Sequence, residues 1–318
     1  GGTPSLLNAD EINHLFEIIG ENYDLSEVTE ITMEANPDDL TEAYLIGLKD
    51  TPINRLSIGV QSFHADDLAW MGRVHDVRQA MECIPLAYKH GFKNLSVDLI
   101  FGYELLTNEK LKYNLDLLNN WKVKHVSAYS LTVEDKTPLL KSVKLGLDKM
   151  PDSEHAADQF IMISEFLVNN GYEHYEISNF AKNGAYALHN SSYWLGNHYL
   201  GVGPSAHSYN GIERKWNIAN NALYIQAVEN KLPYSEIEIL TVIQQMNELI
   251  MTSLRTMWGL DLNRFKQQFG EQHTSTLLHN IQSAENNKLL ITNENILTIS
   301  PEGKFLADGI ISDLFFDD

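Results

Sequence analysis

The run Arg55-Leu56-Ser57-Ile58-Gly59-Val60 is short, apolar and rich in β-branched residues, and a long stretch of helical period separates it from Leu95-Ser96-Val97-Asp98-Leu99-Ile100. Similar short runs occupy residues 30–34 and 125–130. Helical patterns cover roughly residues 8–20, 39–49, 64–91 and 107–121. Parallel strands need crossover connections, which are usually helices, so this alternation predicts a parallel α/β sheet or partial barrel.

Several of these predicted strands end in polar or glycine residues that a core does not need. Glu34 and Gln61 end the first two strands, and the third carries Asp98 before it ends at Gly102. A carboxylate inside an apolar strand is costly to bury unless another group pairs with it. Ligands bind at the carboxyl ends of parallel strands, so these residues together predict a polar ring around one ligand. Each residue alone could also be an ordinary turn or capping residue.

The chain opens with the glycine-rich turn Gly1-Gly2-Thr3-Pro4-Ser5, with no initiator methionine and no strand before it. Glycine has no side chain, so such a turn lets the backbone approach a ligand closely. We therefore expect a truncated enzyme-like domain, part of whose active site lies outside the sequence.

Composition limits the classes of partner. The chain has 318 residues, 43% of them hydrophobic, which predicts two domains, here 1–232 and 233–318. The formal net charge is -20, which argues against nucleic acid or an anionic membrane as the main partner. Cys83 is the single cysteine, so no disulfide within the chain and no cysteine-based metal cage can form. Its apolar neighbours predict an inert core thiol.

The sequence shows no signal peptide and no apolar run long enough to span a bilayer. A cytoplasmic protein without an integral membrane segment is therefore expected.

Residues 172–210 have a different character, rich in histidine, tyrosine, asparagine and glycine. Aromatic residues beside histidines and close-approach glycines predict a flat, apolar ligand with one polar or metal centre. His189, His198 and His207 are the candidate ligands, and His198 and His207 are the weaker ones because their glycine-rich surroundings also suit a plain turn.

The last segment predicts a separate module. Helical patterns at 234–256, 261–269 and 272–287 precede two short strands at 289–292 and 296–299, joined by a turn. Three helices and a hairpin describe a winged-helix-like α+β domain. Because this segment has no basic stripe, we interpret it as a packing or lid domain and not as a DNA-binding one.

In this order the segments resemble the radical SAM family of oxygen-independent coproporphyrinogen III oxidases and their relatives, the HemW haem chaperones. The resemblance covers essentially the whole chain and rests on a colinear series of motifs: Gly1–Ser5, Glu34–Pro37, Arg55–Phe63, Gly72–His75, Ser96–Gly102, Ser127–Thr132 and Tyr175–Ala181. It implies a parallel (β/α) radical SAM barrel, which holds six parallel strands in the family and here lacks its first strands.

The resemblance also implies cofactors. In the family, three cysteines spaced C-x3-C-x2-C bind a [4Fe–4S] cluster, whose fourth iron takes S-adenosylmethionine. These cysteines are absent from the chain, so a cluster is expected in the intact protein only. By their positions in the family motifs, the residues implied to contact S-adenosylmethionine are Gly1, Gly2, Thr3, Glu34, Gln61, Arg73 and Asp98. Carboxylates can accept hydrogen bonds from ribose hydroxyls, and Arg73 can bind a carboxylate.

Two functions compete within this resemblance. The oxidases decarboxylate porphyrinogen propionates by radical chemistry, whereas the HemW proteins are thought to bind haem and deliver it to apo-haemoproteins. The motif H-N-x-x-Y-W is typical of the HemW branch, and it is present here as His189, Asn190, Tyr193 and Trp194. The resemblance therefore favours the chaperone, with His189 as the haem-iron ligand and the other three as haem contacts. The oxidase is the alternative, and a core-facing or capping role for His189 also remains open.

Overall fold

Residues 3–317 are described by the structure, a computed structural model, so the prediction for Gly1 and Gly2 lies outside the described residues. Contacts divide the chain into two units. The α/β unit comprises the residues up to 174 and 178–186, and the C-terminal unit comprises 175–177 and 187 onward. The predicted boundary between residues 232 and 233 falls inside the C-terminal unit and stays a prediction.

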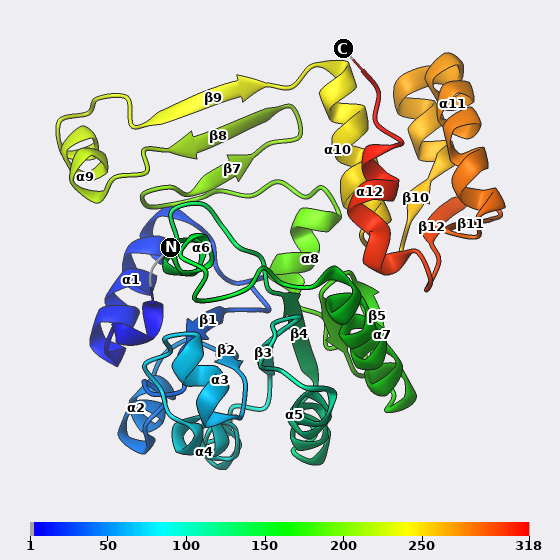
Figure 1. The fold of residues 1–318 in the computed structure, drawn as a ribbon. Coiled ribbons are helices and arrows are strands. Elements are labelled where there is room, and N and C mark those ends of the chain that lie inside the picture. Colours follow the sequence, from blue (N-terminus) through cyan, green and yellow to red (C-terminus); the bar gives the residue numbers. More distant parts are fainter. Residues whose placement is uncertain (1–2, 318) are drawn as a thin grey trace. The chain divides into compact units, whose positions relative to one another are not determined.

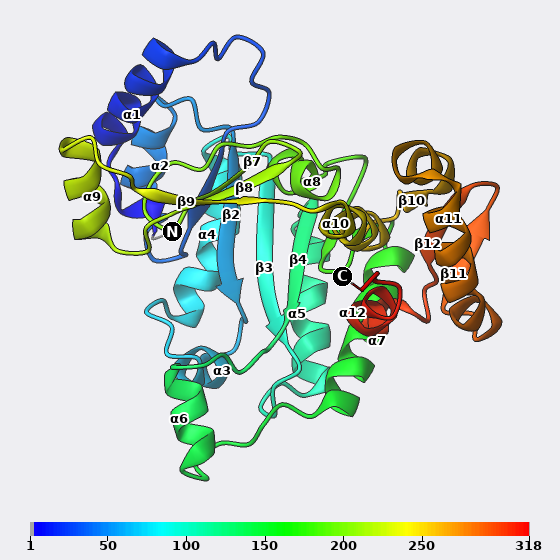
Figure 2. The ribbon, with the colours of Figure 1, turned by 90° about the horizontal axis from the view of Figure 1, so that it is seen from above.

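A six-stranded sheet organises the α/β unit, with the strand order β1-β2-β3-β4-β6-β5 (Figure 1). Its first four strands are parallel, and β6 runs antiparallel to β4. Figure 2 shows β2, β3 and β4 side by side. The strands are β1 (Thr32–Ala35), β2 (Arg55–Gln61), β3 (Leu95–Phe101), β4 (His125–Ser130), β5 (Glu173–Glu176) and β6 (Asn179–Ala181).

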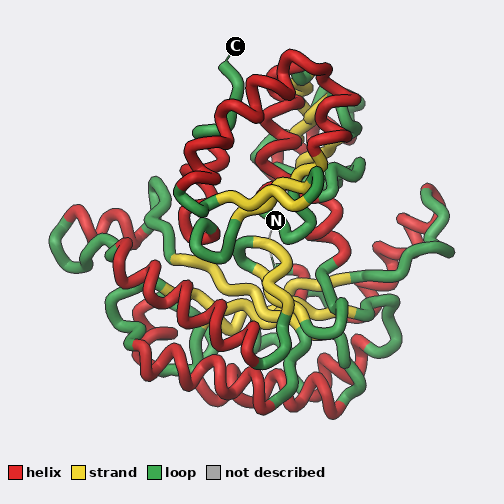
Figure 3. Tube along the Cα trace, turned by 90° about the vertical axis from the view of Figure 1, so that its right-hand side faces the viewer, coloured by secondary structure: helices red, strands yellow, loops and turns green. Residues whose placement is uncertain are grey.

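Alternation along the strands separates two faces of this sheet. In β2 the side chains of Leu56, Ile58 and Val60 are fully buried on one face. Helices cover one side of this sheet (Figure 3). Ser57, between Leu56 and Ile58, and Gln61, directly after Val60, lie on the opposite face. The helices of this unit are η1 (Pro4–Leu6), α1 (Ala9–Asn22), α2 (Glu42–Leu48), α3 (Ala65–Trp70), α4 (Val77–Lys89), α5 (Asn108–Asn120), α6 (Pro138–Lys144) and α7 (Ser153–Asn169).

The single helix predicted over 64–91 is wrong, because the chain breaks it into α3 and α4. Gly72 has a φ of 66°, which ends the first helix. A capping box between Asp76 and Gln79 then starts the second helix.

The C-terminal unit contains two small sheets, β7-β8-β9 and β10-β12-β11, both antiparallel. Its strands are β7 (His207–Tyr209), β8 (Glu213–Asn217), β9 (Ser235–Ile239), β10 (Leu260–Asp261), β11 (Leu290–Asn293) and β12 (Ile296–Ile299). Its helices are α8 (Leu188–Trp194), α9 (Asn221–Glu229), α10 (Val242–Leu254), α11 (Leu262–Asn286), η2 (Lys304–Leu306) and α12 (Ala307–Ser312). The predicted α+β module is confirmed: α10, α11 and α12 surround a core with the hairpin of β11 and β12.

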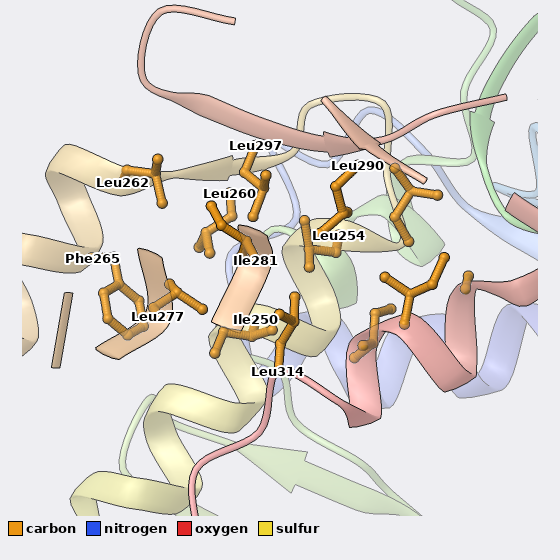
Figure 4. Close-up of a cluster of buried hydrophobic side chains, with 14 of the residues drawn as sticks. Ile250, Leu254, Leu260, Leu262, Phe265, Leu277, Ile281, Leu290, Leu297 and Leu314 are labelled. Atoms are coloured by element: carbon orange, nitrogen blue, oxygen red, sulfur yellow. The ribbon is translucent and has the colours of Figure 1, made fainter. Parts of the chain in front are cut away.

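Buried apolar side chains hold this module together, among them Ile250, Phe265, Leu277 and Leu297 (Figure 4). The predicted break between residues 269 and 272 is present as a kink in α11 at Gly270, which has a φ of 86°.

The helix predicted over 234–256 is wrong in its first part. Residues Ser235–Ile239 form strand β9, and the helix begins only at Val242, after a capping box between Thr241 and Gln244. Glutamate and isoleucine alternate in this stretch, which is typical of a strand, and the strand pairs with β8. The side chains of Ile237 and Ile239 are exposed.

Replacing Gly259 by Ala is expected to destabilise the C-terminal unit by at least about 2 kcal/mol. Gly259 has a φ of 68°, and an added Cβ would lie 2.4 Å from the backbone oxygen of Leu297. Denaturant unfolding measures the loss. Gly196→Ala is the matched control, because Gly196 has a φ of 70° with open space around it and isolates the backbone cost of about 1 kcal/mol. Equal losses in the two variants would contradict the predicted clash.

Candidate functional site

A cavity of about 220 Å³ opens on the inner face and carboxyl ends of β1, β2 and β3. It brings together every described residue that was predicted to contact S-adenosylmethionine, namely Thr3, Glu34, Gln61, Arg73 and Asp98. The other lining residues are Pro4, Ala35, Asn36, Ser57 and Gly59. Residues distant in sequence therefore meet at one site, as the rule for parallel sheets requires.

The strands position these side chains through their pleat and pairing. Ser57, Gly59 and Gln61 alternate with buried apolar residues, so they share the face that lines the cavity. The register places Glu34 beside Ser57 in the neighbouring strand. The register between β2 and β3 shifts between Ile58 and Gln61, and Gln61 then pairs with Leu99.

Asp98 carries an unusual carboxyl group in this cavity. Burial raises its pKa to about 6, and the nearby Glu34 charge acts in the same direction. Ser127, Arg55 and Ser57 oppose the shift, the last through a hydroxyl whose Oγ lies 3.4 Å from Asp98 Oδ1. Asp98 is thus mostly ionised at neutral pH, which suits an acceptor for ligand hydroxyl groups.

Polar groups continue below Asp98 on the inner face of the sheet. The Oγ atoms of Ser127 and Ser96 lie 3.2 Å apart, and Ser96 Oγ lies 2.7 Å from His125 Nδ1. Burial lowers the pKa of His125 to about 3, and the Arg55 charge adds to this effect, so the imidazole is neutral. We call Asp98, Ser127, Ser96, His125 and Arg55 the inner polar column.

Arg55 completes the column, and the residue is only 3% exposed. Its Nε lies 3.9 Å from a Glu30 carboxylate oxygen. Within residues 3–317, its Nε and Nη2 have no hydrogen-bond partner.

Arg73 supplies the cationic wall of the cavity. Its Nη2 donates to Asn36 Oδ1 at 2.8 Å and to the Gly59 carbonyl oxygen at 3.3 Å. Its buried Nε has no hydrogen-bond partner in the described part of the chain. A guanidinium with an unused donor beside a cavity suits a ligand carboxylate.

The four residues predicted to contact haem lie on α8 of the C-terminal unit. His189 and Tyr193 are one turn apart, and the Tyr193 hydroxyl lies 2.8 Å from His189 Nε2. Asn190 and Trp194 form the adjacent pair, and the Arg255 guanidinium lies 5.6 Å from the centre of the Trp194 ring. Both His189 and Tyr193 are exposed. The helix therefore presents an imidazole and two aromatic rings within one short segment.

The two weaker histidine candidates lie elsewhere in this unit. The His198 ring centre is 6.4 Å from that of Tyr209, and the His207 ring centre is 6.4 Å from that of Trp216. Among residues 3–317, no group of three or more histidine, cysteine, aspartate or glutamate side chains is arranged to hold a metal ion.

Sequence reasoning missed several residues at both sites. Ser57 and Gly59 line the cavity, and their inward positions could have been read from the period of two in β2. Tyr199 packs edge-on against Tyr193 with ring centres 4.6 Å apart. That contact had no signal, because it depends on how the chain folds back after α8.

The residues present do not fit a [4Fe–4S] cluster. The sequence contains one cysteine, Cys83, which is 1% exposed on α4. Burial raises the pKa of its thiol to about 12, so it is a poor thiolate ligand and a core residue, as predicted. Separately, no helix within residues 3–317 is long and apolar enough to cross a membrane.

Two family models match parts of the chain. The family model of the radical SAM superfamily matches residues 1–118, and that of the HemN C-terminal domain matches residues 240–306. The heme chaperone HemW of Lactococcus lactis is 32% identical over 318 residues, which are 100% of this chain and 84% of that protein. Radical S-adenosyl methionine domain-containing protein 1, mitochondrial, of Danio rerio is 31% identical over 329 residues, covering 100% of this chain and 74% of that protein.

Among solved structures, coproporphyrinogen III oxidase (HemN) from Escherichia coli, described as a radical SAM enzyme, matches with a TM-score of 0.82. The match covers 99% of this chain and 76% of that chain at 22% identity. It confirms the predicted α/β fold with its C-terminal α+β module.

Proposed function

Because the chain belongs to the HemW family of radical SAM proteins, we propose that it is a haem chaperone that binds haem and S-adenosylmethionine. The observation that carries the S-adenosylmethionine part is the convergence of Glu34, Gln61, Arg73 and Asp98 on one cavity. The full-length similarity to HemW proteins and the intact motif on α8 support the haem part.

In this proposal the cavity holds part of S-adenosylmethionine, since its volume of about 220 Å³ is below the roughly 300–1,000 Å³ of sites that enclose a whole ligand. Asp98 and Glu34 accept hydrogen bonds from the ribose hydroxyls, and Arg73 binds the carboxylate of the amino-acid part. Gly59 leaves room for the ligand beside the strand. Bound S-adenosylmethionine supplies a sulfonium group, whose positive charge these carboxylates favour.

We propose a [4Fe–4S] cluster only for a protein that also has the three cysteines of the family motif. These 318 residues contain one cysteine and therefore no such set.

For haem, we propose that His189 is an axial ligand of the iron and that Tyr193 and Trp194 contact the macrocycle. If Nε2 of His189 binds the iron, its hydrogen bond with the Tyr193 hydroxyl must open first. Asn190 contributes a polar contact beside them. The acceptor of the haem would be an apo-haemoprotein, tested by transfer of haem to an apo-globin.

Replacing His189 by Ala is expected to shift the Soret band of the haem complex and to weaken haem binding, because an axial ligand is lost. Absorbance titration of the full chain with haemin measures both. His279→Ala is the matched control, since His279 is an exposed histidine of the same unit, on α11. A spectrum of His189→Ala identical to that of the unmodified protein would rule out His189 as the ligand.

Coproporphyrinogen oxidation is the alternative function, and it has support from fold similarity alone. The motif from His189 to Trp194 favours the chaperone over it. A cytoplasmic location is likewise a proposal, tested by cell fractionation.

A further inference from the structure

We propose that His75 is a positioning residue of the cavity: its imidazole holds the Val60 carbonyl and thereby the strained turn that directs Gln61 toward the ligand. This inference rests on the proposed nucleoside site, and it gives a role to a histidine that the proposed function does not use.

The turn at Gln61 is unusual. Gln61 has a φ of 67°, and the backbone N–H of Ser62 donates to the Val60 carbonyl oxygen at 2.8 Å. A hydrogen bond that spans one residue with positive φ is a γ-turn of the rare, strained kind. Such a conformation persists in a residue with a Cβ only where the surroundings hold it, and it is typical of functional sites.

His75 makes a second hydrogen bond to the same Val60 carbonyl oxygen. Its Nε2 lies 3.1 Å from the Val60 oxygen, and its side chain is 1% exposed. A carbonyl oxygen can only accept, so Nε2 carries the proton and donates. Burial lowers the pKa of His75, so the neutral imidazole is the form present at pH 7.

The loop between α3 and α4, which contains His75, also binds the carbonyl oxygen of Gly59. Arg73, two residues before His75, donates through Nη2 to the Gly59 oxygen, so the pair binds consecutive carbonyls of β2. The loop after β1 also packs against His75, because Asp38 Oδ1 lies 3.9 Å from His75 Nδ1. Asn36 in that loop accepts from Arg73. Loss of the imidazole would therefore loosen Gln61 and Arg73 together.

The first test compares His75→Leu and His75→Gln in the full chain by calorimetric titration with S-adenosylmethionine. His75→Leu has no donor for Val60 and is expected to bind about tenfold more weakly. The side-chain amide of Gln can place its nitrogen near the position of Nε2, so His75→Gln is expected to bind within about twofold of the unmodified protein. Failure of His75→Gln to restore affinity would overturn the proposal.

His174→Leu is the matched control for a purely structural effect. His174 is another buried histidine of the α/β unit, 7% exposed, and its ring stacks on Phe180 with centres 4.0 Å apart. The His174→Leu variant is expected to lower the free energy of unfolding without changing the affinity for S-adenosylmethionine. If His174→Leu weakens binding as much as His75→Leu does, the effect is general destabilisation and the proposal fails.

The second test needs no ligand. Amide hydrogen exchange of Ser62 reports the γ-turn directly, and it is expected to be about tenfold faster in His75→Leu and unchanged in His75→Gln. Unchanged exchange in His75→Leu would overturn the positioning role. If S-adenosylmethionine fails to bind the unmodified protein but exchange responds as expected, the nucleoside proposal fails and the positioning role stands.

If His75→Leu does not fold, His75→Asn replaces it. The shorter Asn side chain places its nitrogen near Nδ1 and not near Nε2, so it is expected to lose the bond to Val60 and to behave as the Leu variant would. Binding and exchange like those of the unmodified protein would overturn the proposal.

Discussion

Replacing Asp98 by Asn is expected to weaken S-adenosylmethionine binding about 100-fold at pH 8 and to make the ligand-free protein more stable. A hydrogen bond to a charged group contributes about 1.5–3 kcal/mol, and about 100-fold in affinity corresponds to roughly 2.7 kcal/mol. The amide keeps the shape of the side chain but removes the charge that strengthens its bonds to ribose hydroxyls.

The gain in stability follows from the direction of the pKa shift. Burial raises the pKa of Asp98 from 3.8 to about 6. A raised folded-state pKa means that the contribution to stability is complete below pH 3.8 and is lost as the pH rises through 6. At pH 8 the buried carboxylate is therefore a net cost, and Asn is expected to recover about 1–2 kcal/mol.

Chemical denaturation between pH 3 and pH 8 measures the stability difference, which should vanish at the acidic end. Calorimetric titration should show that affinity of the unmodified protein falls below pH 6, whereas the Asn variant lacks this dependence. Asp66→Asn is the control, because Asp66 is an exposed carboxylate of the same unit. Equal affinities of the unmodified protein and Asp98→Asn at pH 8 would exclude Asp98 as a ligand contact.

Replacing Gly59 by Val is expected to reduce S-adenosylmethionine affinity by more than about 100-fold while changing the free energy of unfolding by less than about 1 kcal/mol. A Cβ added at Gly59 would lie 2.9 Å from Gln61 Nε2 and 3.5 Å from Arg73 Nη2, so the new side chain occupies the cavity. The strand itself tolerates the change, because β-branched residues suit strands and the close neighbour is the end of a flexible side chain.

Titration and denaturant unfolding of the same preparation separate the two effects. Gly47→Ala is the control, since Gly47 lies on α2 and an added Cβ there would meet Ala9 at an ordinary 3.6 Å. Retained affinity in Gly59→Val would show that the ligand does not lie against β2.

Much of the α/β unit could be predicted because its signals are local. Their short apolar, β-branched runs identified β2 and β3 as strands, and the rule for parallel sheets then brought Glu34, Gln61 and Asp98 to one edge. Arg73 could not be placed this way, because it lies in a loop whose position depends on packing. Only its family motif connected it with the cavity.

Two features were predicted wrongly or missed because they depend on contacts between distant parts of the chain. The segment before Val242 was included in a helical pattern over 234–256, yet it forms strand β9, on which Ile237 and Ile239 are exposed. The inner polar column was missed except for Asp98. The buried surroundings of His125 and Arg55 come from strand neighbours that lie far away in sequence.

The inner polar column has a consequence for how this protein can evolve. Stability of the α/β unit comes from the apolar side of its strands, where Leu56, Ile58 and Val60 meet the helices. The opposite side carries hydroxyl, carboxyl and imidazole groups that contribute little apolar burial. Substitutions that retune ligand choice can therefore accumulate on that side while the scaffold keeps its strength, which lets one architecture diversify into chaperones and enzymes.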